Sequence, residues 1–403
     1  MAAGSLIVLA VPAGLVAGLG ALWAVAAVTG DRYVALAVAA PVPAALVWLS
    51  CRWALRRVAG ARARRWAPIA VAVVELAAVA VPVAGLLFGG PPQRPIEAAP
   101  GTRYWDLPTG SRIAYTRTPA RGERRDTPVI LVHGGPGAPD TEPSPLAPAL
   151  AAAGFDVYAY HQVGAGLSSR LPDVRGYTVA RHVADLDAIR AAIGADTVVL
   201  AGVSWGGQLT AAYLAAHPDR VARAVVASPG TIWSPAFPDN RHMTESGLRD
   251  QNRALWDRHP RLVLASALAE VAGPRATHAL LPDEAMDGEF GSLVGELDLR
   301  AGCPGRPLRV PQAGSGFWAN LMTGRDARSA ADPRPALRRV TVPVLVLRGS
   351  CDYLAPEVAR EYAEVLPNAV FRPVPGSGHD IARDRADEYR DLVTAFLRGR
   401  PTP

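Results

Sequence analysis

A serine flanked by glycines marks a sharp strand-to-helix turn in this chain. Residues 202–206 read G-V-S-W-G, the β-branched run 197–201 precedes them, and the helix-favouring stretch 208–217 follows. Such a turn raises the serine and brings the positions two before and two after it into near contact, so only very small residues fit there. The pattern therefore indicates a strand-turn-helix unit with Ser204 as a candidate nucleophile.

Short apolar runs alternate with helical stretches after residue 100. The runs rich in β-branched or aromatic residues are predicted strands: 112–116, 129–132, 157–160, 198–201, 224–227, 342–347 and 370–374. Predicted helices fall between several of them, at 179–193, 208–217, 356–365 and 385–398. This alternation predicts an α/β fold with a mainly parallel sheet and helices on both of its faces.

The alternation stops between residues 229 and 340, where tryptophans, prolines and mixed charge replace the strand-like runs. We expect a largely helical cap there, inserted into the sheet domain, because the later runs are needed to finish the sheet. A separate following domain is the alternative. The predicted organisation is a core of 101–228 and 341–403, interrupted by the cap 229–340 and preceded by a proline-rich linker, 91–100.

The first ninety residues carry three long apolar runs. Residues 6–28 and 33–50 contain no charged side chain, and 67–88 contain only Glu75. Runs of this length can cross a bilayer, so residues 1–90 are predicted to hold three transmembrane helices. A cleaved signal peptide is the alternative for the first run, and buried core helices are the alternative for all three.

The distribution of charge predicts on which side of the membrane the sheet domain lies. Six arginines separate the second and third apolar runs, whereas only Asp31 and Arg32 separate the first two. By the positive-inside rule the arginine loop is cytoplasmic, which places the rest of the chain on the extracytoplasmic side of the cell membrane. Residues 1–100 hold eight arginines against three acids, a net +5 of the chain's +6, so the basic balance gives no support to nucleic-acid binding.

Two polar residues follow predicted strands near the C-terminus. Asp352 comes after the run 342–347 and His379 after the run 370–374. A serine nucleophile needs a base to accept its proton, an acid to orient that base and donors for the oxyanion. The order Ser204, Asp352, His379 is that of α/β-hydrolases. We expect these three residues to form a catalytic triad that uses neither a metal ion nor a cofactor.

A glycine-rich loop supplies candidate donors for the oxyanion. Residues 133–137 read H-G-G-P-G directly after the predicted strand 129–132, and glycines let a backbone approach a ligand closely. We expect the oxyanion hole to combine the N–H groups of Gly135 and Trp205. His133 is expected to hold the loop in place rather than to act as a base.

The part of the chain after residue 100 resembles the proline iminopeptidase family of α/β-hydrolases. The resemblance is carried by Asp352, His379 and three motifs: HGGPG at 133–137, HQVGAGLS at 161–168 and GVSWGG at 202–207. It implies release of an N-terminal residue, often proline, from a small peptide or aminoacyl substrate by the triad. The family's second motif usually reads DQRGxGxS, so His161 and Val163 replace its aspartate and arginine, and that ion pair is lost.

The resemblance also implies that glutamates of the cap hold the free α-amine of the substrate. The acidic stretch 283–298 contains the candidates Glu289 and Glu296, and a solvated acidic face is the alternative interpretation of either residue. Of the three cysteines, Cys303 and Cys351 lie in the predicted outer domain, where they form either a disulfide or two free thiols.

The sequence thus predicts a membrane-anchored serine hydrolase that acts as an aminopeptidase on proline or small apolar N-terminal residues. An esterase or lipase-like hydrolase on the same triad is the first alternative. A non-catalytic membrane-anchored binding protein is the second, and the intact triad argues against it. The sequence does not determine the oligomeric state.

Overall fold

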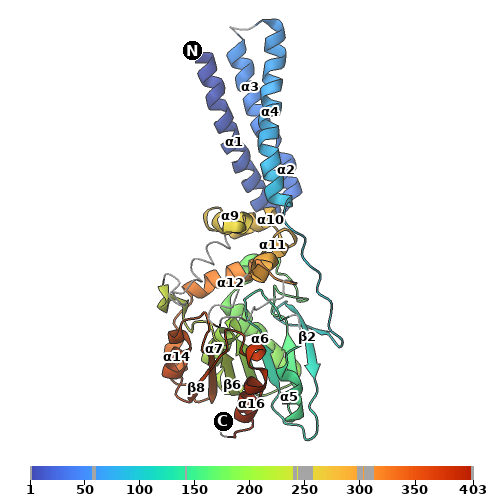
Figure 1. The fold of residues 1–403 in the computed structure, drawn as a ribbon. Helices are drawn as coiled ribbons and strands as arrows, with labels where there is room; N and C mark the ends of the chain where they lie inside the picture. The colour runs from blue at the N-terminus through green and yellow to red at the C-terminus, as the bar shows by residue number, and fades with distance from the viewer. Residues whose placement is uncertain are drawn as a thin grey trace. The chain divides into compact units, whose positions relative to one another are not determined.

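The computed structural model describes residues 2–56, 60–140, 143–238, 257–296 and 313–400, together with Met243 and Cys303. The chain divides into two compact units. The N-terminal unit consists of Met1–Pro92 and Pro260–Met286, and the sheet unit consists of Gln93–His259 and Asp287–Pro403. Figure 1 shows the elements of both units.

The N-terminal unit is helical. Its elements are α1 (Ala2–Thr29), α2 (Arg32–Ala39), α3 (Pro41–Leu55), α4 (Ala61–Phe88), α9 (Pro260–Val271) and α10 (Pro274–Leu280). Helix α3 packs against α1 and α4, and α10 packs against α1. The Asp31 side chain caps α2 by accepting hydrogen bonds from the N–H groups of Tyr33 and Val34. A helix pair distant in sequence, α9 and α10, therefore joins the N-terminal bundle.

Two helical segments are long and apolar enough to cross a membrane, Ala10–Thr29 and Arg32–Leu55. They contain most of the first predicted run and all of the second. The third run, 67–88, forms the greater part of α4. The described structure thus gives two candidate spans where the sequence predicts three.

Glu75 of α4 points into the helical bundle. The side chain of Glu75 is 6% exposed, and its Oε1 atom lies beside Gly14 of α1. Gly14 also lies next to the carbonyl of Pro43 of α3. The small side chains of α1 leave room for this carboxyl group between the helices. Helix packing therefore accounts for the position of the acid within the third apolar run.

The sheet unit is built on eight strands in the order β1-β2-β4-β3-β5-β6-β7-β8. The strands are β1 (Arg103–Asp106), β2 (Arg112–Thr118), β3 (Val129–Val132), β4 (Val157–Tyr160), β5 (Val198–Val203), β6 (Val221–Ala227), β7 (Val344–Gly349) and β8 (Ala369–Val374). Strand β2 pairs antiparallel with β1 and β4, and all other neighbours pair parallel. The prediction of a mainly parallel sheet is confirmed.

Helices cover the sheet. They include α5 (Leu146–Ala152), α6 (Val179–Ile193), α7 (Trp205–Ala216), α14 (Pro356–Val365), α15 (Ile381–Asp384) and α16 (Ala386–Leu397). On one face, Leu150 of α5 and Val393 of α16 join a buried cluster with Val199 of β5. Val198 and Leu200, which point to the opposite face because side chains alternate along a strand, are also fully buried.

The segment between β6 and β7 is largely helical in its described residues. Besides α9 and α10 it forms a 3-10 turn (Ser234–Ala236), α11 (Asp283–Glu296), α12 (Phe317–Ser329) and α13 (Arg334–Leu337). Among its described residues, Met243 forms an isolated antiparallel β-bridge with Leu354, which follows β7. Part of this insertion, Pro260–Met286, groups with the N-terminal helices rather than with the sheet.

Candidate active site

Ser204 lies at the junction of β5 and α7 in a strained conformation. Its φ is 55° and its ψ is −121°, a combination that non-glycine residues rarely adopt. A Cβ atom on Gly202 would collide with the carbonyl of Gly206, and one on Gly206 would collide with the carbonyl of Val132. Glycine at both positions therefore permits the turn that raises Ser204.

His379 and Asp352 form a buried pair. The Nδ1 atom of His379 lies 2.8 Å from Oδ1 of Asp352, which also accepts a hydrogen bond from the N–H of Leu354 at 3.0 Å. Burial by itself would raise the pKa of Asp352, but the charge and hydrogen bond of His379 and the N–H of Leu354 hold it below its usual value. An ionised Asp352 favours the proton on Nδ1, which leaves Nε2 of His379 as the basic nitrogen.

Tyr353 is a neighbour of the pair that the sequence reasoning missed. Its hydroxyl lies 3.5 Å from Nε2 of His379, and the two rings pack with centroids 4.4 Å apart. Burial raises the pKa of Tyr353 above its ordinary value, while a hydrogen bond with the Ser204 side chain acts in the opposite direction. In the described residues the Ser204 and His379 side chains share no direct hydrogen bond, and Tyr353 contacts both. Its position next to Asp352 in the sequence was the available clue.

The glycine-rich loop passes beside the serine. A Cβ atom on Gly134 would lie only 3.2 Å from Cβ of Ser204, and Gly135 has a φ of 114°. Among the backbone hydrogen bonds of the described residues, the N–H groups of Gly135 and Trp205 donate none. Neither of the two predicted oxyanion donors thus gives its N–H to a backbone carbonyl of the described residues. The loop that contains Gly135 lies close to Ser204.

His133 holds this loop through hydrogen bonds. Its Nδ1 lies 2.7 Å from the carbonyl of Gly134, and its Nε2 accepts from the N–H of Gln162 at 2.9 Å. The Gln162 side chain in turn donates to the carbonyl of His133 and accepts from the indole N–H of Trp205, each at 2.8 Å. Burial lowers the pKa of His133 to about 4, so the ring is neutral near pH 7. These contacts agree with the structural role expected for it.

His161 fills the position of the family's aspartate with neutral hydrogen bonds. Its Nδ1 accepts from the N–H of Leu167 at 3.0 Å, and its Nε2 lies 3.1 Å from the carbonyl of Asp140. Burial lowers the pKa of His161 to about 4. Val163, at the position of the family's arginine, is buried. Backbone contacts therefore take the place of the lost ion pair in this loop.

The acidic stretch is not an open row of carboxylates. Glu289 is 7% exposed, and its Oε1 lies 3.4 Å from Nδ1 of His259. Asp287 is buried and pairs with Arg170 at 3.0 Å. Glu296 is the last residue of α11, and its side chain lies outside the described residues. Of the two candidates for amine binding, the described one thus has a partner within the protein.

Cys303 and Cys351 form a disulfide with their Cα atoms 5.1 Å apart. The bond links the insertion between β6 and β7 to the residue that precedes Asp352. Cys51 is the free cysteine, buried in α3. Across the described ranges, no group of three or more His, Cys, Asp or Glu side chains is arranged to hold a metal ion.

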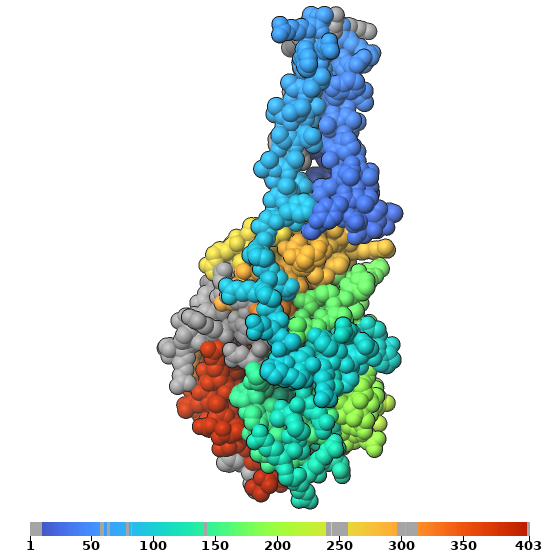
Figure 2. All heavy atoms as spheres, turned by 90° about the vertical axis from the view of Figure 1, so that its right-hand side faces the viewer, coloured from blue at the N-terminus to red at the C-terminus, as the bar shows by residue number. Residues whose placement is uncertain are grey.

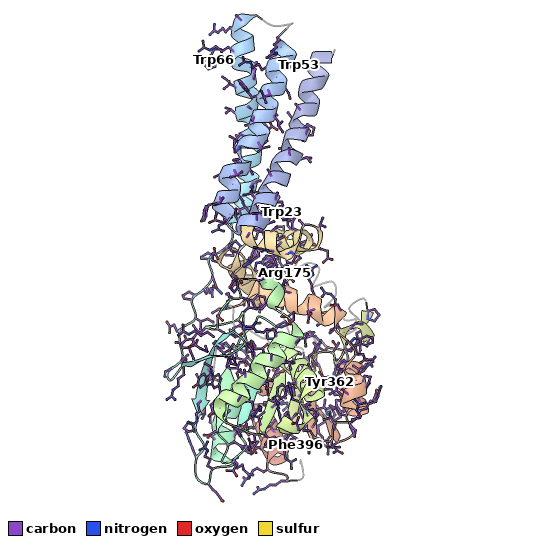
Figure 3. The ribbon with its side chains drawn as sticks, turned by 180° about the vertical axis from the view of Figure 1, so that it is seen from behind. Trp23, Trp53, Trp66, Arg175, Tyr362 and Phe396 are labelled. Atoms are coloured by element: carbon purple, nitrogen blue, oxygen red, sulfur yellow. A yellow bond between two sulfur atoms is a disulfide. The ribbon has the colours of Figure 1, made fainter. Side chains whose placement is uncertain are left out.

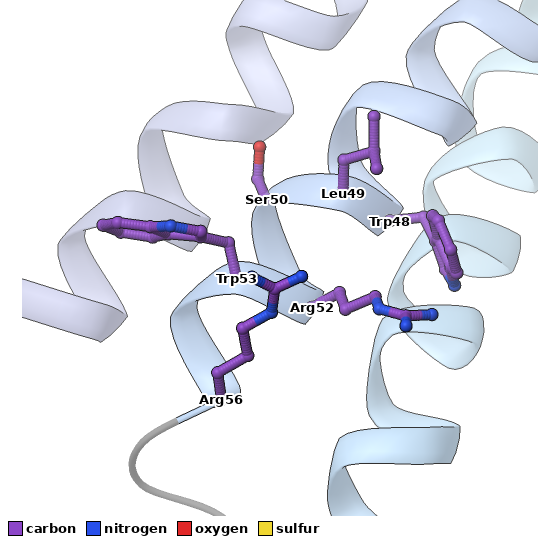
Figure 4. Close-up of a pocket in the computed structure, with 6 residues that line it drawn as sticks. All are labelled: Trp48, Leu49, Ser50, Arg52, Trp53 and Arg56. Carbon is purple, nitrogen blue, oxygen red and sulfur yellow. The ribbon is translucent and has the colours of Figure 1, made fainter.

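A surface pocket in the N-terminal unit contains none of the predicted site residues. It is lined by Trp48, Leu49, Ser50, Arg52, Trp53 and Arg56 near the C-terminal end of α3 (Figure 4). The guanidinium of Arg52 lies 5.1 Å from the ring centroid of Trp48. This pocket combines aromatic and cationic side chains and lacks a nucleophile paired with a base.

Comparison with known proteins gives matches centred on the sheet unit. The family model described as alpha/beta hydrolase fold matches residues 127–385. A proline iminopeptidase from Lactobacillus delbrueckii subsp. bulgaricus is 26% identical over 299 residues, which cover 72% of this chain and 96% of that protein. A proline iminopeptidase from Levilactobacillus brevis is 27% identical over 281 residues, covering 67% and 88%.

Solved structures share the fold at lower identity. A thermophilic esterase from Thermogutta terrifontis aligns with a TM-score of 0.51 and 19% identity, over 74% of this chain and 98% of that one. An enol-lactonase from Burkholderia xenovorans aligns with a TM-score of 0.50 and 22% identity, over 73% and 100%. At such identities the likeness concerns the fold alone.

Proposed function

The chain belongs to the α/β-hydrolase family, and on that premise we propose that it is a serine aminopeptidase. Its substrates are short peptides or aminoacyl derivatives with proline or a small apolar residue at the N-terminus. The observation that carries the proposal is the buried His379–Asp352 pair, 2.8 Å apart, with Tyr353 connecting His379 to the strained Ser204. Proline iminopeptidases, 26% and 27% identical, support the substrate class.

The proposed reaction is acyl transfer through the serine. Ser204 Oγ attacks the scissile carbonyl while Nε2 of His379 takes its proton, and Asp352 stabilises the resulting imidazolium. The N–H groups of Gly135 and Trp205 bind the developing oxyanion. His379 then protonates the leaving amine, and a water molecule activated by the same imidazole hydrolyses the acyl-enzyme. This reaction uses neither a metal ion nor a cofactor.

One observation favours the esterase alternative. The described carboxylates Asp287 and Glu289 have partners in Arg170 and His259, so each would have to exchange that partner to hold a substrate amine. An ester substrate lacks a free α-amine and needs no such carboxylate. The two functions use the same triad and differ in whether the substrate must carry an unblocked N-terminus.

Three membrane spans with the sheet unit on the extracytoplasmic side complete the proposal. Helix α4 supplies the third span beside the two candidate segments, and its apolar run follows the arginine-rich loop. Figure 3 shows Trp23 near one end of the bundle and Trp53 and Trp66 near the other, as expected for indoles at two membrane interfaces. The Cys303–Cys351 disulfide supports an oxidising compartment.

The test compares substrates with free and blocked N-termini. The full chain, purified in detergent, is assayed on proline and alanine anilides, on their N-acetylated forms and on simple esters. A strong requirement for the free amine supports the aminopeptidase, whereas equal rates on blocked substrates or preference for esters support the esterase. Ser204→Ala should remove roughly six orders of magnitude in kcat, as in serine proteases. Ser266→Ala on α9 serves as the control, and retained turnover in Ser204→Ala would exclude the triad.

A further inference from the structure

Helix α9 exposes an apolar face. Its buried side chains are Arg261, Leu262, Ala265 and Ala269. The opposite side, called here the apolar face of α9, consists of the exposed residues Val263, Leu264, Ala267 and Val271. Val263 is 44% exposed, Leu264 38% and Val271 87%. Glu270 is the charged side chain on this exposed side. A helix that faces water ordinarily has the reverse distribution, so this face calls for an apolar environment.

Both ends of α9 are tied to helices of the N-terminal bundle. Near its first turn, Nε of Arg261 donates to the carbonyl of Leu86 at 2.8 Å, close to the C-terminal end of α4. Just past its last turn, the carbonyl of Ala272 accepts from the indole N–H of Trp23 at 3.2 Å, toward the C-terminal end of α1. A helix of 12 residues is about 18 Å long, enough to reach from one helix end to the other.

The figures show the same arrangement within this unit. In Figure 1, α9 and α10 lie across the end of the bundle at which α1 and α4 terminate. In Figure 2, the yellow and orange atoms of these segments adjoin the blue helices directly. The axis of α9 thus runs across the bundle axis, which is the orientation of a helix that lies in a membrane surface.

We infer that the apolar face of α9 is buried in the interfacial layer of the bilayer. The inference rests on the proposed membrane spans. Indoles concentrate at the level of the lipid headgroups, and Trp23, which marks that level on α1, is hydrogen-bonded to the residue that follows α9. A helix lying in the interface buries its apolar side among the headgroups and the first methylene groups. The lipid surface supplies the apolar environment that the described residues of the protein do not give to Val263, Leu264 and Val271.

The inference gives the insertion between β6 and β7 a second attachment to the membrane. Helices α9 and α10 belong to that insertion by sequence and to the N-terminal unit by packing. The segment proposed to form the cap is therefore held by lipid contacts as well as by the spans. The part of the proposed cap that contains α9 and α10 is then attached to the bilayer, and this attachment does not depend on contacts with the sheet unit.

The experiment measures lipid contact at single positions in the full chain. In a Cys51→Ser background, an environment-sensitive fluorophore is attached through Leu264→Cys or Val271→Cys, and the protein is reconstituted into vesicles of phosphatidylcholine and phosphatidylglycerol. Nitroxide lipids labelled at the headgroup or deep in the acyl chain serve as quenchers. Val16→Cys on α1, 71% exposed and seven residues before Trp23, reports the spans themselves. Val370→Cys on β8 is the matched control, because it is 38% exposed like Leu264.

We expect the probes on α9 to shift their emission to the blue and to lose intensity with the headgroup nitroxide, whereas the Val370→Cys probe does neither. Quenching at Val16→Cys without quenching at Leu264→Cys and Val271→Cys would overturn the inference and leave the anchor intact. A blue shift on α9 that no nitroxide lipid quenches would mean that protein, from this chain or a second copy, covers the face. Absence of quenching at all positions would refute the anchor itself.

Discussion

At the residue scale, the site depends on buried histidines that stay uncharged. Burial lowers the pKa of His133 and His161 to about 4 and that of His182 to about 3. His133, in the loop beside Ser204, and His161, in the loop that carries Gln162, each accept a backbone N–H on one ring nitrogen. Protonation of that nitrogen would break the bond, so neutrality of these rings is a condition for the loop geometry.

The first prediction concerns stability at acidic pH. His133 titrates near 6.5 in the unfolded chain and near 4 in the folded one, so between these values the unfolded state binds more protons. The free energy of unfolding should therefore fall as pH decreases from about 6.5 to 4, by about 3 kcal/mol from His133 alone. His133→Asn should give a shallower decline, measured by urea unfolding at several pH values. Identical slopes in both proteins would show that His133 takes its proton in the folded state.

The second prediction concerns Tyr353. Its protonated hydroxyl lies beside Nε2 of His379, where the leaving group receives its proton. Tyr353→Phe should lower kcat/KM about tenfold on anilides, the value of one hydrogen bond, and much less on nitrophenyl esters, whose leaving groups need little assistance. Tyr213→Phe is the matched control, because its buried hydroxyl donates to Asp187 instead. Increased activity in Tyr353→Phe would mean that the phenol competes with Ser204 for the base.

At the element scale, the β5–α7 junction is built around close backbone contact. Gly206→Ala would push a methyl group into the carbonyls of Val132 and His133. We expect it to cost roughly 1–3 kcal/mol of stability and most of the activity, because Ser204 and Trp205 must move. Gly324→Ala on α12 is the control, since its Cβ would meet nothing closer than 3.9 Å and should stabilise the helix by about 0.5–1 kcal/mol. Chemical denaturation and kcat/KM report both effects, and equal behaviour of the two variants would contradict the packing argument.

At the scale of the whole molecule, one disulfide joins the insertion to the sheet unit. Cys303 and Cys351 are separated by 48 residues, and closing a loop of that length stabilises the folded state by about 4 kcal/mol in the chain-entropy model. Cys303→Ser should lower the unfolding free energy by up to that amount, and a reductant should do the same to the native protein. Cys51→Ser, outside the disulfide, should leave the response of the unfolding free energy to reductant unchanged. Identical unfolding curves with and without reductant would show that the disulfide is absent in the purified protein.

Most of the strands and helices could be predicted because each depends on a local pattern of apolar and polar residues. The runs 129–132 and 157–160 are β3 and β4, and the stretches 179–193 and 356–365 are α6 and α14, with the bounds predicted. Strand β1 and helix α5 were missed. The strand is short and mostly exposed, and the helix is short with an internal proline, so neither has an apolar period that reveals it.

The sequence by itself determined the alternation of strands and helices, the sharp turn at Ser204 and the residues expected beside it, because periodicity, glycine placement and motif order are local properties. Only the tertiary structure decided the contacts between distant segments. It placed Tyr353 against His379, gave Glu289 its partner His259, and grouped α9 and α10 with the N-terminal helices. Such contacts depend on how several elements pack in space, and no single stretch of sequence encodes them.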